Sequence, residues 1–157
     1  MEVLINANEC DSSTVKLAEE LREVLAKIVE QLSGNYGGDI EHLWVDIELS
    51  EMSAQVFGKP PKAFRFQKRV SGASRMGLPA IPDSFNVGHY SVRPDFEMIK
   101  QNTIEQSIHY IIGLVYKSTE ALFPKQKKLG GFDVSSFRND FLFACTKLGF
   151  TVNNESL

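Results

Sequence analysis

Residues 40–50 read IEHLWVDIELS, and they form the most regular alternating stretch of the chain. Apolar residues occupy every second position, with mostly polar residues between them. Successive side chains of a β-strand point to opposite faces, so the stretch predicts a strand with one buried face. The buried set would be Leu43, Val45, Ile47 and Leu49, and the opposite set His42, Trp44, Asp46 and Glu48.

Residues 60–70, PPKAFRFQKRV, form a second alternating stretch with four basic side chains. Strand geometry would separate the two phenylalanines, Phe64 and Phe66, from the arginines. That separation disfavours an RNA-reading strand, which needs exposed aromatic rings beside its cations. Antiparallel pairing of residues 63–70 with residues 42–49 would instead set the two arginines, Arg65 and Arg69, opposite Asp46 and Glu48. Such pairs contribute only about 0.2–1 kcal/mol each, but they fix the register of a hairpin.

Helical periodicity and one further alternating stretch predict the remaining elements. A first helix begins after Asp11, Ser12 or Ser13 and stops at Gly34. Its inward stripe is Val15, Ala18, Leu21, Leu25, Ile28 and Leu32, while Glu19, Glu20, Glu23 and Glu30 face solvent. A third short strand, GHYSVRP at residues 88–94, leads into helical sequence. The spacing of residues 103–106 predicts a capping box where the long helix restarts. Pro124 is expected to end that helix, and a last helix covers about Ser136–Leu148.

These elements predict a single α+β domain over residues 1–157. Its core would be an antiparallel sheet of three to four strands with helices packed on one face. The Gly- and Pro-rich loop at residues 71–87, SGASRMGLPAIPDSFNV, is unusually long for a compact domain. Loops of this length commonly carry function, so we expect this one to border a site.

Composition is that of a soluble globular protein, with 43% hydrophobic and 24% charged residues. The start of the sequence does not resemble a signal peptide, so we expect a cytoplasmic protein. Cys145 falls within an apolar helical pattern and is predicted to be buried. Cys10 lies in a polar segment, where no neighbouring base would activate its thiol.

Charge is distributed unevenly along the chain. Residues 1–51 hold twelve acids and three bases, a net charge of −9, whereas residues 52–82 hold six bases and no acid. Segments of opposite charge attract separate partners or each other.

The outward face of the predicted sheet is the candidate site. The binding residues that we select are His42, Trp44, Asp46, Glu48, Arg65, Arg69, Arg75, His89 and Arg93. The sequence contains no GxGxxG, phosphate-loop, GxSxG, HExxH or CxxC motif, so we predict no catalytic residue, metal ligand or cofactor.

Three interpretations of this face stay open. It is a solvated sheet face, a recognition surface in which tryptophan and arginine act as hot spots, or a metal or acid–base cluster. His42 and Asp46 would lie about 13 Å apart along one strand, too far to share an ion.

We favour a non-catalytic domain that covers a protein partner. The acidic first third of the chain suits a basic partner, so an immunity-type inhibitor of a nuclease-like toxin is one concrete form. The alternative is an enzyme or small-molecule binder that holds an anionic ligand between the sheet and the 71–87 loop, with His89 as its acid–base group. Binding of nucleic acid through residues 59–75 is less favoured, and no membrane partner is expected.

Overall fold

The structure is a computed structural model that describes residues 1–8, 10–32, 36–37, 43–50, 64–69 and 87–152. Its strands are β1 (Glu2–Asn6), β2 (Leu43–Glu48), β3 (Phe64–Arg69) and β4 (Val87–Val92). Its helices are α1 (Ser12–Glu30), α3 (Phe96–Gln101), α4 (Ile104–Ser118), the 3-10 segment η3 (Thr119–Leu129) and α5 (Val134–Lys147). Within the described ranges the predicted strands and helices are therefore confirmed as elements.

The four strands form one mixed sheet in the order β1-β2-β4-β3. β1 and β4 both run parallel to β2, and β3 alone runs antiparallel, beside β4. The predicted antiparallel α+β sheet is wrong, because two of the three strand pairs are parallel. Alternation could not reveal this, since a strand of either direction has the same period of two. The link from β1 to β2 includes α1, which gives the crossover that a parallel pair requires.

The predicted hairpin between residues 42–49 and 63–70 is also wrong. β4 lies between β2 and β3, so the backbone of Asp46 neighbours Ser91, and Ser91 neighbours Arg65. Arg65 and Arg69 are therefore not cross-strand partners of Asp46 and Glu48. The alternation of residues 64–69 is the same beside β2 as beside β4, so the sequence could not exclude an intervening strand.

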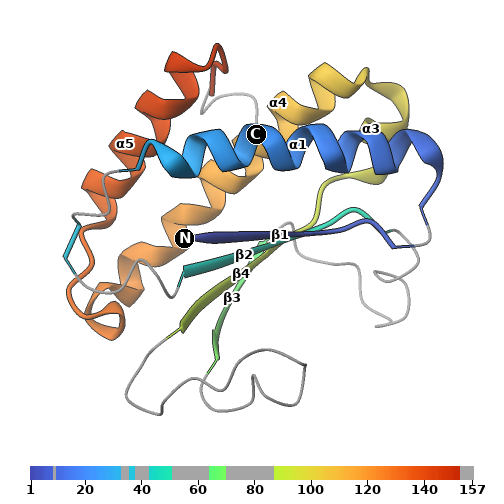
Figure 1. Cartoon of the computed structure of the whole chain (residues 1–157). Coiled ribbons are helices and arrows are strands. Elements are labelled where there is room, and N and C mark those ends of the chain that lie inside the picture. Colours follow the sequence, from blue (N-terminus) through green and yellow to red (C-terminus); the bar gives the residue numbers. More distant parts are fainter. Residues whose placement is uncertain (9, 33–35, 38–42, 51–63, 70–86, 153–157) are drawn as a thin grey trace.

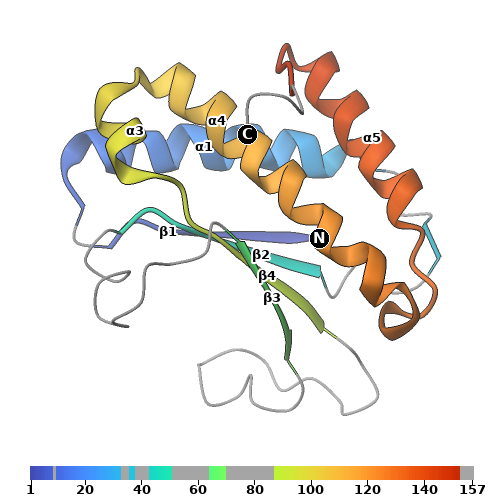
Figure 2. The same cartoon turned by 180° about the vertical axis from the view of Figure 1, so that it is seen from behind.

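The described helices lie on one side of the sheet, where α1 passes over the β1 end and α4 and α5 lie beside it (Figures 1 and 2). The core fills the space between these layers. Its buried side chains include Leu21, Leu25 and Ile28 of α1, Val45 and Ile47 of β2, Val92 of β4, Ile111, Ile112 and Val115 of α4, and Phe137, Phe141 and Cys145 of α5.

Most of the predicted core is confirmed, including Leu49 and Cys145. Val15 is an exception, because its side chain in the first turn of α1 is 39% exposed. The side chains of Leu43, Phe64 and Phe66 lie outside the described part of the chain. The three-four spacing thus identifies the buried face of α1 but not where along its length the burial begins.

The long helix restarts where its capping box predicts. The hydroxyl of Thr103 accepts the backbone N–H of Gln106 at 3.2 Å, and the Gln106 side chain accepts the N–H of Thr103 at 2.9 Å. The predicted end at Pro124 is wrong, because α4 stops at Ser118 and η3 continues with Pro124 inside it. Ser118 donates its hydroxyl to the Val115 carbonyl, which offers that carbonyl a partner other than the next helical N–H.

Candidate functional site

The carboxyl ends of β1, β2 and β4 meet at one edge of the sheet because these strands are parallel. Asn6 ends β1 there, and its Nδ2 donates to Glu48 Oε2 at 2.9 Å. The other carboxylate oxygen of Glu48 accepts the backbone N–H of Ser50 at 2.9 Å. The backbone N–H of Leu49 donates to the Asn6 carbonyl at 2.8 Å. Glu48, a predicted binding residue, thus joins the ends of β1 and β2.

Cys10 lies at the same edge, where its Sγ contacts the Leu49 carbonyl oxygen at 3.5 Å. Burial raises the pKa of the Cys10 thiol, and the negative charges of Asp11 and Glu48 raise it further. A raised pKa leaves the group as a thiol at neutral pH, and the thiol is the unreactive form. The setting of Cys10 therefore opposes a nucleophilic role.

Backbone register brings some predicted binding residues to neighbouring positions. Trp44 of β2 lies beside His89 of β4, two register positions from the row that contains Asp46, Ser91 and Arg65. The sheet thus places residues of the candidate surface on three consecutive strands, in a different strand order from the predicted one.

The described part of the chain covers this candidate surface incompletely. His42 and Arg75 lie outside the described residues, as do the side chains of Trp44, Arg65, Arg69 and His89. The described members are Asp46, Glu48 and Arg93, which are all half-buried. Ligand binding by the full set stays a prediction.

Arg93 follows directly after β4, at the carboxyl edge. Its side chain is half-buried, and its Nε atom is buried with no hydrogen-bond partner. Nearly all buried polar atoms in proteins are hydrogen-bonded, so this nitrogen marks an unusual position. Arg93 belongs to the predicted binding residues because of its place in an alternating strand, but that pattern could not indicate an unpaired donor.

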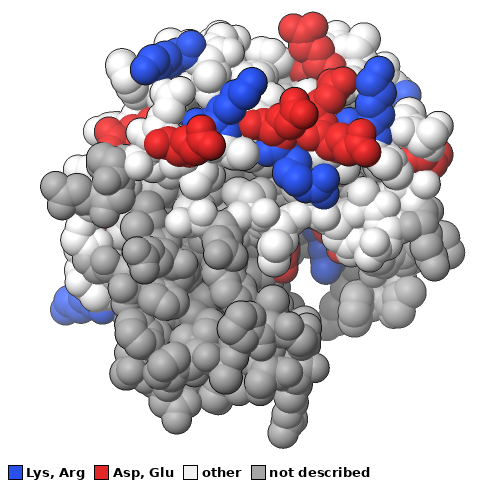
Figure 3. All heavy atoms as spheres, viewed as in Figure 1, with Lys and Arg blue, Asp and Glu red and all other residues white. Residues whose placement is uncertain are grey.

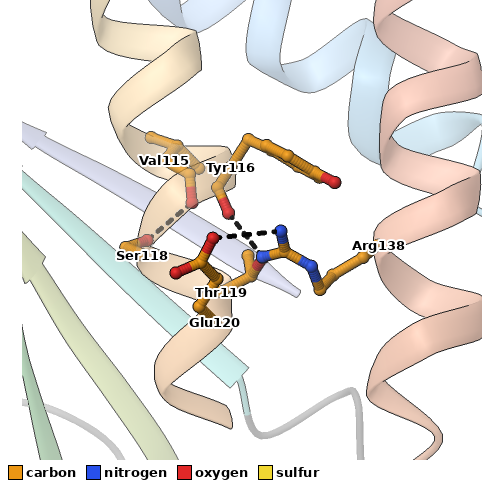
Figure 4. Close-up of polar contacts among 6 residues, drawn as sticks. All are labelled: Val115, Tyr116, Ser118, Thr119, Glu120 and Arg138. Carbon is orange, nitrogen blue, oxygen red and sulfur yellow. Dashed lines mark hydrogen bonds and ion pairs between the residues drawn. The ribbon is translucent and has the colours of Figure 1, made fainter. Parts of the chain in front are cut away.

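A second arginine, Arg138 of α5, is buried, and the sequence analysis missed it. Its Nη1 donates to the Tyr116 carbonyl at 3.0 Å and also bonds the Thr119 hydroxyl (Figure 4). Its Nη2 lies 3.6 Å from Glu120 Oε1, and its guanidinium carbon lies 4.2 Å from the centroid of the Tyr116 ring. Lysine and arginine near a helix C-terminus stabilise the last carbonyls.

Arg138 therefore has an architectural role, since its partners all come from the end of α4 and the start of η3. The sequence contains only a weak indication that Arg138 is buried. Arg138 adjoins the inward residue Phe137 in the sequence, but its partners lie about twenty residues earlier, and no local pattern joins the two segments.

Charge on the helical side of the molecule is mixed. Acidic and basic side chains are interspersed over α1 in Figure 3. The exposed members are Lys16, Glu19, Arg22, Glu23, Lys27 and Glu30, and Glu20 is half-buried. α1 contains four acids and three bases, a net charge of −1. Residues 1–51 have a net charge of −9, and a net charge of −8 therefore lies outside α1, on β1, β2 and the segments next to them in the sequence.

The described residues contain neither a three-residue metal cluster nor a membrane-spanning helix. No group of three His, Cys, Asp or Glu side chains there could hold a metal ion. None of the helices in these ranges has the length and apolar composition needed to cross a membrane. Comparison with protein-family models, with curated proteins and with solved structures finds no match to this chain.

Proposed function

We propose that the chain is a non-catalytic protein-binding domain whose partner presents a basic surface to the β1–β2 side of the sheet. An immunity-type inhibitor of a basic toxin is one concrete form of this proposal. The observation that carries the proposal is the separation of charge along the strand order, in which the acids of β1 and β2 and the bases of β3 belong to opposite ends of the sheet.

The acidic end consists of β1 and β2, whose charged residues are Glu2, Asp46 and Glu48, with no base on either strand. The basic end is β3, which carries Arg65, Lys68 and Arg69 and lies at the opposite edge of the sheet. β4 separates the two, so the opposite charges are not cross-strand pairs that cancel each other. A field of this kind attracts and orients a charged protein during association.

Leu4 offers a direct test of the proposal. It lies on β1 beside Asp46 in the register, and its side chain is 44% exposed. The chain is first used to capture a stoichiometric protein from the source cells at low salt, and association is then measured with that purified partner. Leu4→Lys should slow association and Leu4→Glu should accelerate it, and both effects should shrink as salt screens the charges.

Glu23 of α1 is the matched control, because it is exposed on the helical side, away from the β1–β2 surface. Glu23→Lys should leave the association rate near that of the wild type. Failure to capture a stoichiometric partner, or an equal loss of rate in Leu4→Lys and Glu23→Lys, would contradict the proposal.

A further inference from the structure

The structure points to a binding site for an oxyanion at Arg93, and this site is independent of the proposed protein partner. Arg93 is the first residue after β4, at the edge where the parallel strands β1, β2 and β4 end. In open sheets with parallel strands, ligands bind outside these carboxyl ends. We propose that Arg93 binds a carboxylate or phosphate group at this edge.

The proposal rests on the hydrogen bonding of the Arg93 guanidinium. Its Nε is buried and donates to no acceptor, although the side chain as a whole is half-buried. Arginine keeps its positive charge at every physiological pH, so it cannot relieve this burial by losing a proton. A buried donor is normally hydrogen-bonded, so an unsatisfied donor of this kind indicates a position that a ligand oxygen could complete.

The carboxylates beside Arg93 are already engaged with other donors. Glu48 follows Ile47, the register partner of Val92, and its two oxygens accept hydrogen bonds from Asn6 of β1 and from the backbone of Ser50, just after β2. Asp95, two residues further along the chain, accepts the backbone N–H of Glu97 at 3.0 Å and caps α3. Among the described residues, neither of these carboxylates accepts a hydrogen bond from the Arg93 Nε.

The chemistry of the guanidinium selects the class of ligand. Nε–H and one Nη–H lie side by side and donate in parallel, which matches two oxygens of a carboxylate or a phosphate. A lysine at this position would offer a point charge without the paired geometry. Since Nε is the donor without a partner, we expect the ligand to approach the side of the guanidinium that contains Nε.

Titration calorimetry with inorganic phosphate and with acetate tests this site, at an ionic strength held constant with sodium chloride. The wild type should bind at least one of these probes saturably at one site per chain. Arg93→Met should abolish binding, and Arg93→Lys should weaken it by roughly 10- to 100-fold, the range for losing a hydrogen bond to a charged group. Which of the two probes binds more tightly distinguishes a phosphate ligand from a carboxylate ligand.

Arg22→Met is the matched control, because Arg22 is an exposed arginine on α1. It should bind the probes as the wild type does. Circular dichroism verifies the fold of each variant. If Arg93→Met does not fold, the calorimetric affinity of Arg93→Lys tests the proposal. Absence of saturable binding of both probes to the wild type, or an unchanged affinity in Arg93→Lys, would overturn the proposal.

Discussion

At the scale of single residues, the buried Arg138 and the half-buried Arg93 differ in the partners of their guanidinium groups. Arg138 has partners for both its Nη atoms and a ring beneath its guanidinium, whereas Arg93 has an unpartnered Nε. The first joins α5 to the end of α4, and the second is placed to receive a ligand. Sequence patterns do not separate the two, because the distinction depends on partners that are remote in the chain.

Arg138 provides a stability prediction that separates two of its interactions. Arg138→Ala should lower the free energy of unfolding by about 2–4 kcal/mol, because it removes a buried charged donor and leaves its acceptors exposed to a cavity. Glu120→Gln should lower it by less than about 1 kcal/mol, because that side chain is 56% exposed and its ion pair is screened by water. Urea denaturation of the three proteins measures both values. Equal losses would show that the ion pair, rather than the hydrogen bonds to α4, holds α5 in place.

Of the described helices, α1, α3 and α5 begin after an aspartate cap. Local sequence predicted the start of α1, but it placed the start of the last helix at about Ser136 instead of after Asp133. Asp11 caps α1 and Asp133 caps α5, each through its carboxylate and backbone N–H groups of the first turn. Donation from the Thr14 N–H lowers the pKa of Asp11, and donation from the Ser136 N–H lowers that of Asp133. The folded state therefore favours the ionised form of both carboxyl groups.

The pH dependence of stability follows from these two caps. Because the folded pKa lies below the unfolded value of 3.8, the stabilisation is present above that pH and is lost as pH falls through the folded pKa. Asparagine is an equally good cap but does not titrate. The double variant Asp11→Asn, Asp133→Asn should therefore lose less stability than the wild type on acidification from about pH 5 to pH 2. Chemical denaturation across this range would contradict the account if both proteins gave the same slope.

At the scale of the whole molecule, element type is predictable from the sequence and element pairing is not. Period and capping are local, so the starts of α1 and α4 and the buried residues of β2 follow from neighbouring residues. Strand order depends on connections that span residues 49–63 and 70–86, and the alternation of Phe64–Arg69 is the same beside β2 as beside β4. The same limit applies to the candidate surface. Alternation predicts the face on which each residue lies, but the strand order decides which of these residues are neighbours.

The strand order is also the claim on which the separation of charge rests. Measurement of nuclear Overhauser contacts between backbone protons in an isotope-labelled sample tests it most directly. The account predicts contacts between β2 and β4 around Asp46 and Ser91, and between β4 and β3 around Ser91 and Arg65. Strong contacts between the α protons of β2 and β3, the signature of the antiparallel hairpin, would contradict it.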